Sequence, residues 1–303
     1  MSENQPPAVR QAVVPAVGAG AAGLSVDAVW SGEEALRVEA RSLRERVAGL
    51  EKQVRARTRV AFAQGVLVGR YGLADAQTAF TVMRDASQRS NIKLHQIAAA
   101  LTTTGEPEPG APVWFPGRTR TPPPSLAALH AGKLDAKNQA EVLDAALDRV
   151  REIAGGDAGN AQLAEAGVLR MERHQGHPQA FTDYFAFVED GTSCSRAAAA
   201  AQQVTVRDVA TTGIFDDETR QVILASGSRA CHSVPLNGTD GVVRGVISSH
   251  HARPVEGFSQ TQLSALERIQ QTVGPWLEWH SKTVVLDALE DLHRSAMDAR
   301  TDA

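Results

Sequence analysis

Residues 229–251 read RACHSVPLNGTDGVVRGVISSHH, and this stretch decides the fold class of the second half of the chain. Its two apolar runs, 229–236 and 242–251, flank the turn sequence NGTDG, a combination that predicts an antiparallel hairpin. Further strand patterns cover residues 160–164 and 168–174, and helical patterns cover residues 138–153, 179–187, 193–201 and 217–225. Antiparallel strands with helices gathered around them are typical of an α+β domain.

A long helical pattern follows the hairpin and begins near Ser259. Its apolar residues on one side are Leu263, Leu266, Ile269 and Val273. Pro275 lacks the backbone N–H that a helix interior needs, so we expect it to kink or end this helix. Residues 284–296 should then resume as a mostly exposed helix.

A proline-rich segment divides the chain. Residues 105–124, GEPEPGAPVWFPGRTRTPPP, hold seven of the 14 prolines, which excludes a helix or a central strand and predicts a semi-rigid linker. Residues 1–30 show no lasting periodicity and are typical of a disordered tail. The predicted organisation is multidomain: a helical module at residues 31–104, an α+β domain at 125–281 and a C-terminal helix or tail at 282–303.

The helical module begins with apolar residues on alternating four- and three-residue steps. The predicted dimer seam consists of Leu36, Leu43, Val47, Leu50 and Val54. So narrow a stripe is typical of a coiled coil and predicts a homodimer; the alternative is a single amphipathic helix packed on its own domain. A helix at residues 76–87 should follow, with Asp75 as its N-cap. Another should cover residues 92–101, with Asn91 near its cap.

The charges are distributed unevenly. The formal net charge is −4, yet residues 37–95 hold 12 Lys and Arg against 5 Asp and Glu. A basic module attached to an acidic remainder suggests that the module meets a polyanion. No run approaches the ~18 apolar residues of a membrane span, so no membrane partner is expected. The two cysteines exclude a disulfide-rich extracellular scaffold and suggest a cytoplasmic protein.

The basic module resembles a known family. The stretches AFAQGVLVGRYG at residues 61–72 and TAFTVMRDASQRSNIKLHQIAAAL at residues 78–101 are similar to the ANTAR domain of bacterial transcription antitermination regulators. The resemblance implies an RNA-binding dimer that holds paired small hairpins in leader transcripts and so blocks a terminator. Two features depart from the family: Gln64 stands where lysine is common, and residues 73–78 are about one residue longer than usual.

The candidate RNA-binding residues are Gln64, Arg70, Arg84, Gln88, Arg89, Ser90, Asn91 and Lys93. The cations among them are suited to neutralising phosphates, and the short polar side chains to reading the edges of hairpin-loop bases. Alternative roles remain open for several of them. Arg70 and Arg84 can equally be solvated or salt-bridged surface residues, and Ser90 or Asn91 can simply cap a helix.

The α+β domain resembles a GAF domain, especially those that accompany ANTAR domains in actinobacterial proteins. The resemblance rests on soft motifs that include GNAQL at residues 159–163, DGTSCSRA at 190–197 and VTVRDVATTGIF at 204–215. It implies an antiparallel sheet with a small-molecule pocket and helices that often dimerise, but it identifies no ligand and no cofactor. The domain order, ANTAR before GAF, is the reverse of the common arrangement.

Polar residues of the hairpin are candidates for the pocket. We expect His232 and His250 to share the pocket face and to fix a ligand, although such histidines more often satisfy local hydrogen bonds. A metal site is not expected, because neighbouring histidines alternate between the faces of a strand. Cys194 and Cys231 raise the alternative of a thiol redox enzyme of the GAF type, against two inert buried thiols.

The sequence therefore predicts a non-enzymatic regulator. In this interpretation a homodimeric RNA-binding antiterminator holds paired hairpins under the control of a GAF domain with an unknown small-molecule ligand. The alternatives are a small-molecule-sensing dimer whose basic module binds protein or DNA, and the redox enzyme. A DNA-reading helix is poorly supported, because residues 92–101 are apolar and carry little beyond Lys93 to contact bases.

Overall fold

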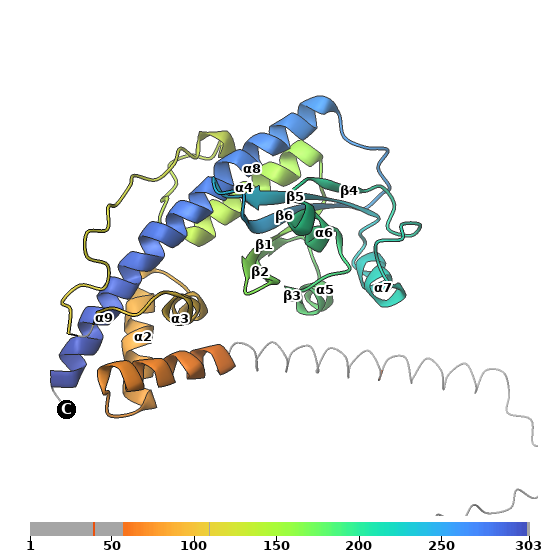
Figure 1. The fold of residues 1–303 in the computed structure, drawn as a ribbon. Helices are drawn as coiled ribbons and strands as arrows, with labels where there is room; N and C mark the ends of the chain where they lie inside the picture. The colour runs from red at the N-terminus through yellow and green to blue at the C-terminus, as the bar shows by residue number, and fades with distance from the viewer. Residues whose placement is uncertain (1–38, 40–56, 109, 302–303) are drawn as a thin grey trace, which may run out of the picture. The chain divides into compact units, whose positions relative to one another are not determined.

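The structure is a computed structural model that describes residues 39, 57–108 and 110–301 (Figure 1). The residues of the predicted dimer seam are Leu36, Leu43, Val47, Leu50 and Val54, and all of them lie outside the described residues. The predicted tail at residues 1–30 also lies outside them. The coiled coil and the tail therefore stay predictions.

Three helices form the N-terminal part of the described chain. Residues 57–71 are helical, α2 covers Ala76–Ser90 and α3 covers Leu94–Thr103. Asp75 is the N-cap of α2, as predicted, because its Oδ1 accepts a hydrogen bond from the Thr78 backbone N–H at 2.7 Å.

The turn between α2 and α3 differs from the prediction. Asn91 has φ 52° and ψ 38°, a left-handed conformation, and it forms the C-cap of α2 instead of capping the next helix. Asparagine tolerates this conformation better than most residues, which explains its presence at a helix C-terminus. The helix α3 begins after Lys93, which makes no side-chain capping hydrogen bond.

Six antiparallel strands form one sheet in the order β3-β2-β1-β6-β5-β4. They are β1 (Ala158–Glu165), β2 (Val168–Gln175), β3 (Phe187–Val188), β4 (Val204–Val206), β5 (Ala230–Asn237) and β6 (Val243–His251). The predicted hairpin is confirmed as β5 and β6, and the α+β class is confirmed with it. The strands β3 and β4 were not predicted, because two or three residues are too few to show an alternating pattern.

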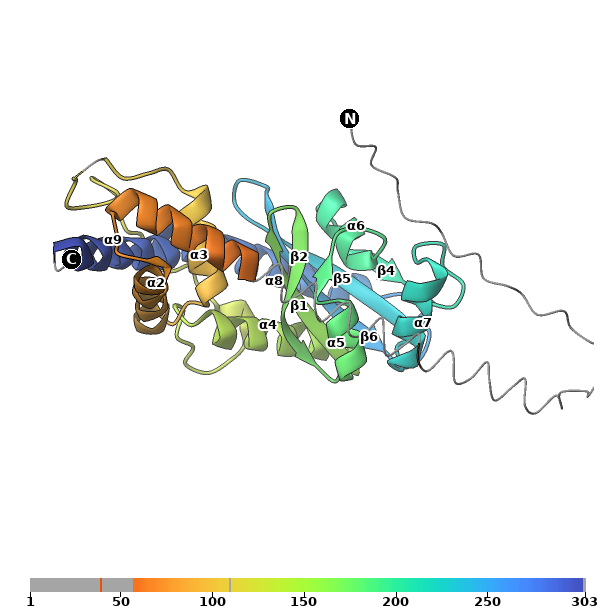
Figure 2. The ribbon, with the colours of Figure 1, turned by 90° about the horizontal axis from the view of Figure 1, so that it is seen from below.

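Helices cover both faces of this sheet (Figures 1 and 2). The helices α4 (Gln139–Ala154) and α8 (Gln260–His280) pack on the face that carries Val234 and Ile247. The opposite face carries Cys231 and Val246 and meets three shorter helices. These are α5 (Gln179–Tyr184), α6 (Ser193–Ala200) and α7 (Asp217–Ala225). A short 3-10 helix, η1 (Ala127–Leu129), precedes α4.

The chain stays helical through Pro275, so this residue does not end the helix. A π-helical turn, η2 (Ser281–Val285), connects α8 directly to α9 (Leu286–Thr301). A proline in a helix interior costs about 3 kcal/mol. Burial of Ile269, Val273 and Trp276 against the sheet outweighs this cost, since each large apolar side chain contributes about 2 kcal/mol.

We expected the C-terminal helix α9 to be mostly exposed. It packs against α2 and α3 instead. Its Leu289 and Leu292 are fully buried, and one continuous hydrophobic core extends from Ala63 in the first helix through α9 to Ile247 in the sheet. A sequence pattern cannot distinguish a face that is solvated from one covered by a distant helix, and here α2 and α3 provide the cover. The helical module and the sheet domain therefore share one core.

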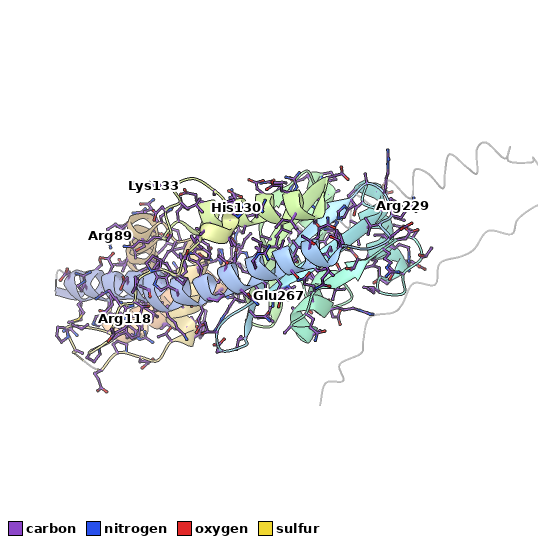
Figure 3. The ribbon with its side chains drawn as sticks, turned by 90° about the horizontal axis from the view of Figure 1, so that it is seen from above. Arg89, Arg118, His130, Lys133, Arg229 and Glu267 are labelled. Carbon is purple, nitrogen blue, oxygen red and sulfur yellow. The ribbon has the colours of Figure 1, made fainter. Side chains whose placement is uncertain are left out.

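The proline-rich segment is held against α9. Residues 104–126 contain no helix or strand where the structure describes them, yet Trp114 is buried. The Glu290 carboxylate of α9 accepts hydrogen bonds from the backbone N–H groups of Trp114 at 3.1 Å and Phe115 at 2.9 Å. Arg118 pairs with Asp287, and Figure 3 shows Arg118 and Arg89 on the two sides of α9.

Candidate functional site

Two candidate RNA-binding residues lie exposed on α2. Arg84 and Gln88 are one helical turn apart, so their side chains leave the helix on the same side. Among the residues that the structure describes, Arg84 pairs with its neighbour Asp85, with 2.8 Å between Nη2 and Oδ1. Both partners are well exposed, so this pair is weak and a phosphate can compete with it.

Gln64 and Arg70 lie on the preceding helix and serve structural contacts. Gln64 Nε2 donates to the backbone oxygen of Ala76 at 2.8 Å and so links the first helix to the start of α2. The Arg70 guanidinium is largely buried, 3.0 Å from Glu106 and 5.1 Å from the ring centre of Trp114. Arg70 is therefore less accessible to an RNA than Arg84.

The candidates around the α2–α3 turn meet carboxylates from other parts of the chain. Arg89 Nε donates a hydrogen bond to Asp291 Oδ2 of α9 at 2.7 Å, and Arg89 Nη2 donates to Ser295 Oγ at 2.9 Å. Lys93 pairs with Glu172 of β2. Asn91 is exposed and Ser90 is half-buried at the same turn. Two of the predicted phosphate contacts are thus paired with acidic groups outside the three-helix unit.

Lys93 belongs to an ion cluster between the three-helix unit and the β1–β2 hairpin. The ring of His95 lies between two carboxylates, with Nδ1 3.6 Å from Glu165 and Nε2 3.4 Å from Glu172. Arg59 pairs with Glu165. Burial opposes ionisation of Glu172, but His95 and Lys93 outweigh it and lower the pKa of this carboxyl to about 2.

Arg170 of β2 completes the ion cluster. Its Nη1 lies 3.7 Å from Glu165 and its Nε lies 3.5 Å from Glu172. Burial opposes ionisation of Glu165 as well. The contacts with His95 and the charges of Arg59 and Arg170 outweigh burial and lower the pKa of this carboxyl. Both carboxylates are therefore ionised at neutral pH and hold the two parts of the chain together.

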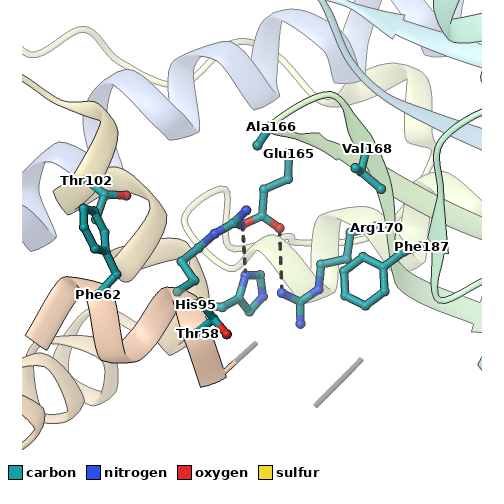
Figure 4. A pocket seen from close by; sticks show the side chains of 10 residues that line it. Thr58, Phe62, His95, Thr102, Glu165, Ala166, Val168, Arg170 and Phe187 are labelled. Atoms are coloured by element: carbon teal, nitrogen blue, oxygen red, sulfur yellow. Dashed lines mark hydrogen bonds and ion pairs between the residues drawn. The ribbon is translucent and has the colours of Figure 1, made fainter. Parts of the chain in front are cut away.

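A pocket of about 510 Å³ opens beside the ion cluster (Figure 4). Its lining residues are Thr58, Arg59, Phe62, His95, Thr102, Glu165, Ala166, Val168, Arg170 and Phe187. They come from the first helix, α3, the β1–β2 hairpin and β3. The pocket thus lies between the basic module and the sheet domain.

Glu165, Glu172 and Arg170 had no predicted role. The available signal was the alternation in β2, where Arg170 and Glu172 share one face and Leu169 and Met171 share the other. Two charged residues on one face of a buried strand require a charged partner. That partner, α3, is more than 70 residues away in the sequence, so a local pattern could not identify it.

The interior of the sheet domain holds a second, much smaller pocket of about 20 Å³. His250 lines it together with Cys194, Cys231 and Asn160, and His250 Nε2 lies 3.2 Å from Asn160 Oδ1. Burial lowers the pKa of His250 well below its usual value, so the ring is neutral. This volume suits about one water molecule, against about 300–1,000 Å³ for a typical ligand pocket.

His232 does not share the pocket face with His250, so this part of the prediction is wrong. In the hairpin His250 lies opposite Cys231, whereas His232 lies opposite Ser249, and adjacent residues of a strand point to opposite faces. His232 instead bonds to Thr205 at 2.8 Å and to Gln203 at 2.9 Å, and burial lowers its pKa to about 4. Its contacts are those of a satisfied core histidine.

Both cysteines are free and buried. Cys194 Sγ lies 3.2 Å from Ser248 Oγ, and Cys231 Sγ lies 3.3 Å from Ser193 Oγ. Burial raises the pKa of both thiols, that of Cys231 to about 12. Thiols in this environment stay protonated and are poor nucleophiles.

Within residues 57–108 and 110–301, no group of three or more His, Cys, Asp or Glu side chains is arranged to hold a metal ion. No helix in the described part of the chain combines the length and apolar character that a membrane crossing requires.

Comparisons with known families agree with this architecture. A family model for the ANTAR domain matches residues 48–101, and a model for the GAF domain matches residues 138–274. The combination supports a regulatory protein. The chain contains an ANTAR domain followed by a GAF domain, which confirms the resemblance and the predicted order. No curated protein matches the chain.

Solved structures that resemble the chain align with about half of it. A type II free methionine-R-sulfoxide reductase from Thermoplasma acidophilum is 20% identical with a TM-score of 0.39, covering 48% of this chain and 96% of its own. A GAF domain/HD domain protein from Geobacter sulfurreducens is 13% identical with a TM-score of 0.40, covering 49% and 95%. A GAF domain of an Acinetobacter phosphoenolpyruvate-protein phosphotransferase is 13% identical with a TM-score of 0.40, covering 50% and 87%.

Proposed function

We propose that this chain is a cytoplasmic, non-enzymatic transcription antiterminator that binds paired hairpins in leader transcripts under the control of its GAF domain. The match to an ANTAR domain supports a regulator, and the basic charge of residues 37–95 supports a polyanionic partner. The observation that carries the proposal is the exposed side of α2. There Arg84 and Gln88 offer a phosphate contact and a base-reading amide one turn apart, next to the exposed Asn91.

A dimer is part of this proposal. One three-helix unit offers only a small polar surface, and a target of two hairpins engages two such units. The predicted seam at Leu36, Leu43, Val47, Leu50 and Val54 would join the two copies. Because joining raises affinity only when both contacts form together, the spacing of the two units would control binding.

The paired cations suggest how the GAF domain exerts control. Lys93 and Arg89 each face a carboxylate that belongs to the sheet domain or to α9, namely Glu172 and Asp291. A transcript phosphate has to displace these carboxylates before it can reach the cations. The docked arrangement would therefore have low RNA affinity, and undocking of the three-helix unit would raise it.

The alternatives for the basic module and the thiols are testable. A protein or DNA partner would use the same cations, so duplex DNA belongs in any competition experiment. A thiol redox enzyme requires an accessible thiolate with a low pKa. The raised pKa values of the buried Cys194 and Cys231 oppose that reading.

The decisive experiment measures RNA affinity by fluorescence anisotropy with the full chain at fixed salt. The probes are a two-hairpin RNA, its single hairpins and a DNA duplex of equal length. We expect the two-hairpin RNA to bind at least tenfold more tightly than either hairpin or the duplex. Arg84→Gln and Gln88→Ala should each weaken binding severalfold, whereas Arg196→Gln, an exposed arginine of α6, should have no effect. Equal affinity for all probes would refute the proposal.

A further inference from the structure

The pocket between the two domains is a candidate for a small-molecule site. Its volume of about 510 Å³ falls within the range of ligand pockets, whereas the interior of the GAF domain offers about 20 Å³. The two pockets do not share a lining residue. A small molecule therefore has more room in the pocket at the domain boundary than in the pocket that His250 lines.

The charges around this pocket favour an anion. Arg59 pairs with Glu165, and Arg170, which points toward Glu165 in Figure 4, lies 3.7 Å from the same carboxylate. Lys93 and Glu172 lie just behind this wall, so three permanent cations face two carboxylates. A guanidinium group matches a carboxylate in its planar, two-pronged geometry, so two arginines beside one carboxylate can also receive the acid group of a ligand.

The apolar part of the wall favours a ring. Phe62 is 63% exposed, one of the few large apolar side chains to be so exposed in the described chain. It lies three residues after Arg59 on the same helix, so the two side chains are neighbours on one face. Across the pocket, Val168 and Phe187 add apolar surface, and the Arg170 guanidinium lies 5.7 Å from the ring centre of Phe187.

We propose that this pocket binds a small aromatic carboxylate, whose ring covers Phe62 and whose acid group takes Arg59 and Arg170 from Glu165. Binding removes part of the attraction that holds the first helix to the β1–β2 hairpin. This step rests on the proposed function, because the released three-helix unit is the one that contacts RNA. The anion thereby favours the undocked, RNA-binding arrangement.

Calorimetric titration of the full chain tests the site without any RNA. The probes are benzoate, indole-3-acetate and 2-naphthoate, and the neutral control is 2-naphthylmethanol, which keeps the ring and lacks the charge. We expect at least one carboxylate to bind once per chain, and naphthylmethanol to bind at least tenfold more weakly than naphthoate. Failure of all three carboxylates to bind, or equal binding of the neutral alcohol, overturns the proposal.

Variants locate the bound anion. Arg59→Gln and Phe62→Ala should each weaken binding at least fivefold, and Glu165→Gln should strengthen it because the competing carboxylate is gone. Arg196→Gln on α6 should leave it unchanged. Phe62 is exposed, so Phe62→Ala keeps the test valid if the arginine variant does not fold. Binding that is insensitive to both pocket variants places the anion elsewhere and refutes the assignment.

Addition of RNA separates this inference from the proposed function. Saturating carboxylate should raise the affinity for the two-hairpin RNA severalfold. If the carboxylate binds at the pocket but no RNA binds under any condition, the proposed function fails and the pocket assignment survives. If RNA binds and no carboxylate does, only the pocket assignment fails.

Discussion

Replacement of Glu172 by glutamine should raise the RNA affinity of the full chain. The Glu172 side chain is 2% exposed, and its pKa is about 2 instead of 4.5. Each factor of ten in that ionisation equilibrium corresponds to about 1.4 kcal/mol, so the ionised form gains about 3 kcal/mol in the docked arrangement. Burial opposes this gain, and the groups that produce it, His95 and Lys93, both belong to the α3 segment of the ANTAR domain.

The effect on binding follows from this gain. Lys93 is about half exposed, and solvent screening reduces the docking contribution of the pair to about 2 kcal/mol. If docking competes with RNA, Glu172→Gln should raise the affinity by about 30-fold. The RNA affinity is measured by fluorescence anisotropy at one fixed salt concentration, because it also varies steeply with salt.

A matched control separates docking from net charge. Glu267→Gln removes one negative charge from the exposed side of α8 and should change the affinity less than twofold. Lys93→Gln also breaks the pair, but it removes a proposed phosphate contact and should not produce the gain. Docking does not compete with RNA if Glu172→Gln and Glu267→Gln have the same affinity at equal folded fraction.

The pH dependence of the same carboxylate has a definite sign. Its pKa is lowered in the folded chain, so its contribution is fully present above about pH 4.5 and is lost as the pH falls toward 2. Glu172→Gln should reduce the pH dependence of the free energy of unfolding over this acidic range, and urea denaturation measures it.

Three further predictions concern the folded chain. Burial lowers the pKa of His232 to about 4 from 6.5, so the free energy of unfolding should fall by about 2–3 kcal/mol between pH 7 and 4.5, and His232→Gln should reduce that loss in urea denaturation. Gly274→Ala places a Cβ 2.0 Å from a backbone oxygen at the end of β5 and should lower the free energy of unfolding by about 3 kcal/mol or more. Gly69→Ala, in the first helix where nothing lies within reach of the new Cβ, should raise the free energy of unfolding by about 0.5–1 kcal/mol. A similar effect of both variants in thermal denaturation would contradict the packing. Cys194 and Cys231 should react with a disulfide reagent only after denaturation, and rapid labelling of the native chain would revive the redox enzyme.

Local patterns predicted most of the secondary structure. The predicted helix at residues 217–225 has the same bounds as α7, whose N-cap is Asp216. The predicted hairpin matches β5 and β6 within a residue or two. These elements carry their own signals, because caps, turns and apolar periods all act between residues close in sequence. The prediction that Asn91 caps the helix that follows it was wrong, because one asparagine between two helices can cap either of them.

The candidate site was predictable only in part. Arg84 and Gln88 lie exposed on α2, which extends three residues beyond the predicted helix end at residue 87. Arg89 and Lys93, in contrast, meet acidic partners from α9 and β2. The prediction that His232 and His250 share one face was wrong because the sequence does not reveal the register of the hairpin. That register depends on the turn and on the bulge between Leu236 and Asn237. A shift of one residue in that register moves every side chain to the other face.

The two domain types, their order and most of the elements within them could be predicted from the sequence alone. Those features depend on periodicity, capping and motif spacing, which the chain carries locally. Only the tertiary structure decided that α9 returns to the ANTAR helices and that Lys93 faces Glu172. The physical reason is that a buried charge selects its partner by position in space, and a helix that returns from the far end of the chain leaves no trace in the segment it covers.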